Sequence, residues 1–205
     1  MMKQKLINFI LFQAGWLAVV LLGTGQFHWL GLVVVAAIVI WHLVTSPSPK
    51  AEAQLIVYAL GIGIIWENLL TLTGVVVYPH GQIFGDLAPV WIMAMWAMLA
   101  TTLNLSLRWL HGRFLLASAF GALGGPLAFL AGERLGAVVF RDSTLAMLVL
   151  AAGWGLMFTL LVLLAMRNDG FVQMFPQARR AESCSLTGCR VCLSCWPWLL
   201  PAVSM

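Results

Sequence analysis

Glu67 lies inside a long apolar segment and is the first candidate for chemistry in this chain. On the same helical face, at steps of three or four residues, lie Gly63, Thr71, Gly74 and Tyr78. A charged group at membrane depth costs at least about 2.5 kcal/mol to insert, so this face is expected to point into the protein. Such a carboxyl group serves as a proton carrier, a general acid or base, or a ligand anchor. The structural alternative is a protonated acid that is bonded to a neighbouring helix.

Other polar residues lie near the same end of the predicted bundle and form one candidate site with Glu67. They are Asn68, Tyr78, His80, Asp86 and Glu133. If they converge, the outer half of the protein holds a polar pocket between apolar walls. Their convergence depends on the tertiary structure.

Small and polar residues in other apolar segments indicate helix packing. Gly121 and Gly125 form a GxxxG pair, which lets two helix backbones approach closely. Pro126 follows directly, removes an amide donor and is expected to kink the helix. Gln13, Thr101 and Asn104 are expected to bond between helices.

The four cysteines all lie near the C-terminus, at Cys184, Cys189, Cys192 and Cys195. Their spacing is compatible with zinc or an iron–sulfur cluster. The surrounding segment lacks the pattern of a folded scaffold, so a metal site there is the disfavoured interpretation. The histidines lie near the ends of apolar segments without metal-ligand spacing, and we expect no metal or other cofactor.

The composition indicates a membrane protein. Of 205 residues, 62% are hydrophobic and 9% are charged, compared with roughly 25% charged in soluble domains. The net charge of +4 is spread thinly along the chain, which argues against nucleic acid as a partner. The expected partners are the lipid bilayer and, through the small-residue faces, other membrane proteins.

Six apolar segments predict an all-α membrane protein, a compact bundle of six transmembrane helices. Each is long enough to cross about 30 Å of hydrocarbon. The predicted helices are 6–22, 27–44, 54–76, 90–107, 114–131 and 144–166. Residues 1–166 form the expected transmembrane domain, and 167–205 are expected to be a disordered cytoplasmic tail.

The distribution of Lys and Arg predicts the orientation. With the N-terminus inside, nine of these residues lie on the cytoplasmic side, and only Arg134 and Arg141 lie outside. The positive-inside rule therefore favours both termini in the cytoplasm. The first apolar segment lacks a signal-peptide cleavage pattern, so it is read as an uncleaved helix.

Three stretches resemble an uncharacterised family of bacterial multi-pass inner-membrane proteins, a domain of unknown function. They are Phe12–Trp16, Pro89 through Trp96 to Asn104, and Gly121–Leu127 through Gly132 to Gly136. The resemblance implies a small multi-helix protein of the bacterial inner membrane and assigns no activity to any residue.

Three functions fit these patterns. The first is the binding or processing of a lipid or other amphipathic small molecule near Glu67. The second is a small proton-coupled permease that uses Glu67 as its titrating acid, although the chain has no convincing internal repeat. The third is a structural subunit of a membrane complex without its own chemistry.

Overall fold

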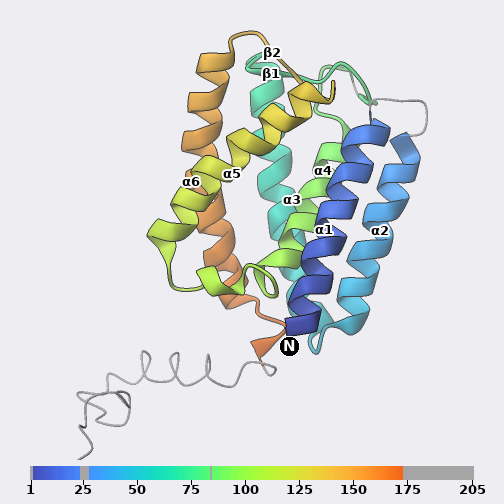
Figure 1. The fold of residues 1–205 in the computed structure, drawn as a ribbon, viewed down its shortest axis with the longest axis vertical. Helices are drawn as coiled ribbons and strands as arrows, with labels where there is room; N and C mark the ends of the chain where they lie inside the picture. Colours follow the sequence, from blue (N-terminus) through green and yellow to red (C-terminus); the bar gives the residue numbers. More distant parts are fainter. Residues whose placement is uncertain (1, 24–27, 84, 173–205) are drawn as a thin grey trace, which may run out of the picture. The chain divides into compact units, whose positions relative to one another are not determined.

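The computed structural model describes residues 2–23, 28–83 and 85–172. These residues form six α-helices, one short 3-10 helix and two short strands (Figure 1). In chain order they are α1 (Met2–Gly23), α2 (His28–Thr45), α3 (Pro49–Leu72), β1 (Val76–Val77), α4 (Val90–Leu103), η1 (Arg108–Leu110), α5 (Phe114–Arg134), β2 (Val139–Phe140) and α6 (Ser143–Arg167). The four cysteines and nearly all of the predicted tail lie outside the described residues.

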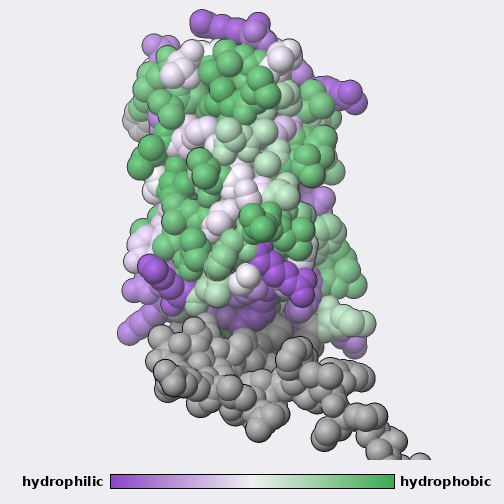
Figure 2. Space-filling model, turned by 90° about the vertical axis from the view of Figure 1, so that its left-hand side faces the viewer, coloured by the Kyte–Doolittle hydropathy of each residue, from purple (hydrophilic) through white to green (hydrophobic). Residues whose placement is uncertain are grey.

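The predicted all-α class with six helices is confirmed, and four of these helices are long and apolar enough to cross a membrane. They are α1, α3, α5 and α6. The helix α4 has 14 residues, about 21 Å of helix, which is shorter than the hydrocarbon layer. Figure 2 shows apolar residues over most of the height of one face, with hydrophilic residues gathered at its upper and lower ends. The chain is a multi-pass membrane protein.

The boundaries of the third and fourth helices differ from those predicted. The third helix begins at Pro49 rather than near residue 54, because proline fits the first turn of a helix, where its missing N–H is not needed. It ends at Leu72, before Gly74 adopts a φ of +70°, and Val76 then enters β1. The fourth helix ends at Leu103 rather than residue 107, and turns and η1 follow it.

The helices form two groups that are joined by the polypeptide around η1. In the first group α1 packs on α2, α3 packs on α4, and α4 also contacts α1 and α2. In the second group α5 crosses α6 obliquely and packs chiefly against it (Figure 1). The strands β1 and β2 pair antiparallel, with Val76 opposite Phe140, and so tie the end of α3 to the α5–α6 connection. This ribbon lies at the end of the bundle opposite the N-terminus of α1 (Figure 1).

Glycine makes the contact between α5 and α6 close. Gly121 and Gly125 are both buried against α6. A Cβ atom at Gly121 would overlap the Trp154 backbone and the Phe158 side chain, and a Cβ atom at Gly125 would overlap the Trp154 ring. Pro126 is accommodated inside α5, which continues to Arg134. The GxxxG pair therefore lies at a helix contact, as close backbone approach requires.

Gly125→Ala should destabilise the protein, whereas Gly124→Ala should leave its stability unchanged or slightly raised. Both changes add one methyl group to the same helix, where alanine is favoured over glycine. Only the methyl group at residue 125 would overlap Trp154, since a Cβ atom at residue 124 meets nothing within 4 Å. We expect a loss of about 1–3 kcal/mol at residue 125, measured by thermal unfolding in detergent. Equal stability of the two variants would contradict the observed α5–α6 contact.

Candidate functional site

The side chain of Glu67 is wholly buried and hydrogen-bonded at both oxygens. The Tyr78 hydroxyl donates to Oε2 at 2.6 Å, and Trp96 Nε1 donates to Oε1 at 2.9 Å. The three residues come from α3, from the segment after β1 and from α4. The carboxyl group therefore joins three separate elements.

Local backbone geometry brings these partners to Glu67. The chain turns back at Gly74, and the pairing of β1 with β2 holds the segment that leads to Tyr78. One turn before Glu67, Gly63 lies so close to the indole of Trp96 that a Cβ atom would overlap the ring. The absence of a side chain at residue 63 thus lets the Trp96 N–H reach the carboxyl group.

The Tyr78 hydroxyl remains a hydrogen-bond donor. Burial raises the pKa of this phenol well above its usual value near 10, and the charge of Glu67 and the hydrogen bond to it raise the pKa further. Tyr78 therefore stays protonated at physiological pH.

A cavity of about 440 Å³ lies beside Glu67 and is bounded by residues of α1, α3, α4, α5 and α6. This volume is within the range of small-molecule sites, roughly 300–1,000 Å³. Its walls are mainly apolar and rich in aromatic rings, among them Trp16, Trp91, Trp96 and Trp154. Glu67 is the one ionisable side chain among the residues that line this cavity.

The other residues of the predicted site do not join Glu67. The Asn68 side chain donates to Ile64 O at 2.7 Å and accepts from Ala88 N at 3.0 Å, so it anchors the connection before α4. His80 and Asp86 are exposed, and Glu133 is partly exposed near the end of α5. Of the five residues predicted to accompany Glu67, the structure brings Tyr78 to its carboxyl group.

The residues predicted to bond between helices have different roles. Asn104 bonds across helices, but Gln13 is exposed and lines the cavity. The Thr101 hydroxyl donates to Met98 O of its own helix, while the Thr101 carbonyl accepts from Asn8 of α1 at 3.1 Å.

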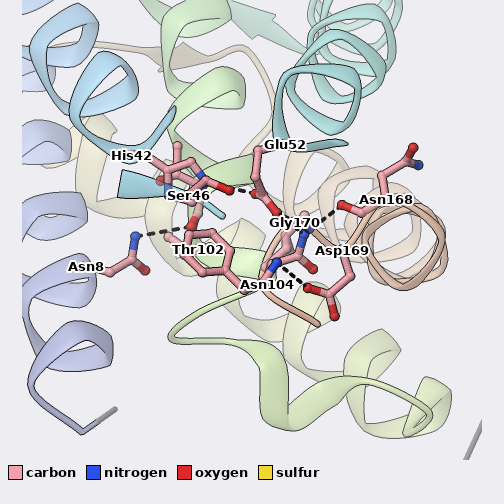
Figure 3. Close-up of polar contacts among 12 residues, drawn as sticks. Asn8, His42, Ser46, Glu52, Thr102, Asn104, Asn168, Asp169 and Gly170 are labelled. Carbon is pink, nitrogen blue, oxygen red and sulfur yellow. Dashed lines mark hydrogen bonds and ion pairs between the residues drawn. The ribbon is translucent and has the colours of Figure 1, made fainter. Parts of the chain in front are cut away.

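A second buried polar cluster lies around Glu52, near the start of α3 (Figure 3). Glu52 Oε2 lies 2.8 Å from His42 Nε2. Its Oε1 accepts from Asn104 Nδ2 at 2.7 Å and from the backbone N–H of Gly170 at 2.8 Å. The carboxyl group of Glu52 thus joins α2, α3, α4 and the segment after α6.

The segment after α6 is held to this cluster by further contacts. Asp169 forms an ion pair with Arg108 of η1, and the Arg108 Nη1 to Asp169 Oδ1 distance is 2.8 Å. Phe171 packs on the His42 ring with a centroid separation of 5.4 Å. A Cβ atom at Gly170 would lie 2.7 Å from Glu52 Oε1, which explains why this position has a residue without a side chain.

The sequence interpretation missed this cluster for a specific reason. Glu52 precedes the apolar segment that was assigned to 54–76, so it was not counted as a buried acid, whereas helix α3 begins at Pro49. His42 lies near the end of an apolar segment and is buried against Glu52. A signal was present, since Glu52, Asn104 and Arg108 all lie at ends of apolar segments on the same predicted side.

No group of three or more potential metal ligands is found among the residues that the structure describes. The cysteine motif lies outside this part of the chain, so its interpretation stays a prediction.

Tyr78→Phe should lower stability more than Tyr58→Phe. The first change removes the donor to a buried carboxyl oxygen, and leaving such an atom unsatisfied costs about 1–3 kcal/mol. Tyr58, the other tyrosine of the chain, is on the same helix as Glu67 and is 46% exposed, so its hydroxyl serves as the control. Thermal unfolding in detergent measures both. A Tyr78→Phe variant as stable as Tyr58→Phe would contradict a structural role for this hydrogen bond.

Comparison with curated proteins and with solved structures found no match. A family model described as a protein of unknown function, DUF2878, matches residues 5–160. The matched region contains all three stretches on which the resemblance rests, together with Glu67, Tyr78, Trp96 and Glu52. Because the match covers more than half of the chain, this membrane protein belongs to the DUF2878 family of unknown function.

Proposed function

We propose that the protein binds a lipid or another amphipathic small molecule in the cavity beside Glu67. The observation that carries this proposal is a largely apolar cavity of about 440 Å³ whose wall includes a single buried carboxyl group. Binding sites for small molecules commonly combine apolar walls with a few polar groups that fix orientation. An amphipathic ligand matches both parts.

The position of the cavity supports entry from the lipid phase. Its lining includes residues of α1 and α5, and α5 packs chiefly on α6. Phe9 of α1 and Leu127 of α5 line the cavity and are also exposed, by 50% and 63%. In a bilayer these side chains would contact acyl chains, so a ligand reaches the cavity sideways without crossing a polar surface.

We further propose that the protein spans the bacterial inner membrane with both termini in the cytoplasm. The nine-to-two distribution of Lys and Arg supports this orientation. The helix α3 then runs outward from Pro49 to Leu72, which places Glu67 in the outer half and Glu52 near the cytoplasmic face. The short α4 completes the bundle between longer helices.

Gly124→Leu should remove a co-purified ligand, because residue 124 lines the cavity and its Cβ direction is open. Native mass spectrometry after purification in mild detergent should show a bound lipid-sized mass on the wild type and much less on this variant. Gly61→Leu is the control, since residue 61 is exposed on α3, has open space at its Cβ position and does not line the cavity.

Glu67→Gln provides an independent variant, because the amide keeps the shape of the side chain and loses its acidic proton. It should fold while the bound mass falls. Retention of the ligand by both Gly124→Leu and Glu67→Gln, or a wild type without any bound small molecule, would contradict the proposal. A stoichiometric protein partner in place of a ligand would favour the structural-subunit hypothesis.

Reporter fusions test the proposed topology. A reporter that is active only outside the cytoplasm should be active after residues 84 and 140 and inactive after residues 49 and 111. The physical reason is the charge bias, because Lys- and Arg-rich connections remain in the cytoplasm. The reversed pattern would overturn the proposed orientation.

A further inference from the structure

We propose that a small cavity between α1 and α2 is a second binding site, which takes a primary ammonium group with His42 as the hydrogen-bond acceptor. This α1–α2 cavity shares no lining residue with the cavity beside Glu67, so the inference goes beyond the proposed function. In a membrane, the head group of an aminophospholipid such as phosphatidylethanolamine supplies a primary ammonium group.

The α1–α2 cavity has a volume of about 120 Å³ and lies near the end of the bundle where α1 begins and α2 ends. It has room for about four groups the size of a water molecule, each of which takes roughly 30 Å³. Its lining includes Gln4 and Thr45, which are exposed and close to the helix ends. The cavity is therefore large enough for an aminoethyl group and lies at the depth of lipid head groups.

The imidazole of His42 lines this cavity and is held in place by Glu52 (Figure 3). Its Nε2 atom lies 2.8 Å from Glu52 Oε2, while Glu52 Oε1 accepts two N–H groups from other residues. An imidazole binds a proton more strongly than a carboxylate does, so the shared proton belongs on Nε2. The Nδ1 atom of the neutral ring is then an acceptor.

The Nδ1 atom of His42 is accessible to a ligand. No described residue donates a hydrogen bond to it. It is not enclosed by protein either, because the enclosed side-chain N and O atoms without a partner in the described residues belong to Trp66, Asn104 and Trp154. Since the His42 side chain is only 3% exposed and lines the α1–α2 cavity, a group in this cavity can reach Nδ1.

The charges around the cavity favour a cation. Its described lining contains no Lys or Arg, whereas the Glu52 carboxylate is bonded to His42. Arg108 of the neighbouring cluster is paired with Asp169. An anionic group in the cavity would therefore lack a cation to pair with.

Aromatic side chains and the free acceptor narrow the choice of cation. Trp41 and Phe171 both line the cavity, and aromatic faces attract ammonium groups. A quaternary ammonium group would be attracted as well, but it has no N–H to donate to His42 Nδ1. A primary ammonium group meets both requirements and is small enough for the cavity.

A lipid competition tests this preference. The full-length protein in mild detergent is mixed with equimolar phosphatidylethanolamine, phosphatidylcholine and phosphatidylglycerol that carry the same acyl chains, and native mass spectrometry counts the adducts. We expect the ethanolamine lipid to exceed each of the others about tenfold, the effect of one hydrogen bond to a charged group. Free ethanolamine is then added in excess. Loss of the lipid adduct shows that the site also takes this group from water, and persistence of the adduct shows that the site requires the lipid.

His42→Gln tests the acceptor. The amide nitrogen of glutamine can take the place of Nε2 and donate to Glu52, while the acceptor at the Nδ1 position is lost. This variant should unfold near the wild-type temperature and bind the three lipids about equally.

Trp41→Leu tests the site without removing the bond to Glu52. Trp41 lines the cavity and is 57% exposed, so its replacement should leave the fold intact. The preference for the ethanolamine lipid should fall about threefold, the effect of one exposed cation–π contact. Trp29→Leu is the matched control, because Trp29 is near the other end of α2, is 52% exposed and does not line the cavity.

Equal binding of the three lipids by the wild type, or a preference for the choline or glycerol lipid, would overturn the proposal. An unchanged preference in a folded His42→Gln variant would also overturn it. If His42→Gln does not fold, an unchanged preference in Trp41→Leu has the same consequence. None of these results depends on a ligand in the cavity beside Glu67, so this site and the proposed function can fail separately.

Discussion

The need to satisfy buried carboxyl groups inside a lipid-facing bundle is the constraint on which this structure depends. Helix–helix association in lipid gains little from the hydrophobic effect, so packing and hydrogen bonds between helices carry more of the specificity. Glu67 meets this constraint with Tyr78 and Trp96, and each of these donors comes from a different element. The β-ribbon, the turn at Gly74 and the close approach at Gly63 all serve to deliver those donors.

The same constraint acts near the other end of α3. There Glu52 joins His42, Asn104 and Gly170, and the Arg108–Asp169 ion pair lies beside them. Breaking a buried network by removing one partner leaves the others unsatisfied, so this cluster fixes how α6 ends relative to α2, α3 and α4. The two carboxyl groups on α3 have different surroundings, because Glu67 borders the large cavity whereas Glu52 does not line it.

The cavity follows from how the two helix groups meet. Gly121 and Gly125 bring α5 close to α6, and together with Gly124 and Ala128 on the same helix they line the cavity. Aromatic side chains from α1, α4 and α6 cover the remaining wall. This is the physical basis for proposing an amphipathic ligand rather than a polar one.

The sequence by itself determined the membrane class, the number of helices and the burial of Glu67, because these depend on hydropathy and on the cost of a buried charge. It also indicated the GxxxG contact, which is a local pattern on one helix. Only the tertiary structure decided which partners reach Glu67. The segment that leads to Tyr78 is held in place because β1 pairs with β2, which lies more than sixty residues later in the chain. Glu52 escaped detection because hydropathy marks where apolar residues begin, whereas the helix begins earlier, at Pro49. Residues of α2, α4 and the segment after α6 together bury the Glu52 carboxyl group. The periodicity of residues along one helix cannot predict contacts of this kind between separate elements.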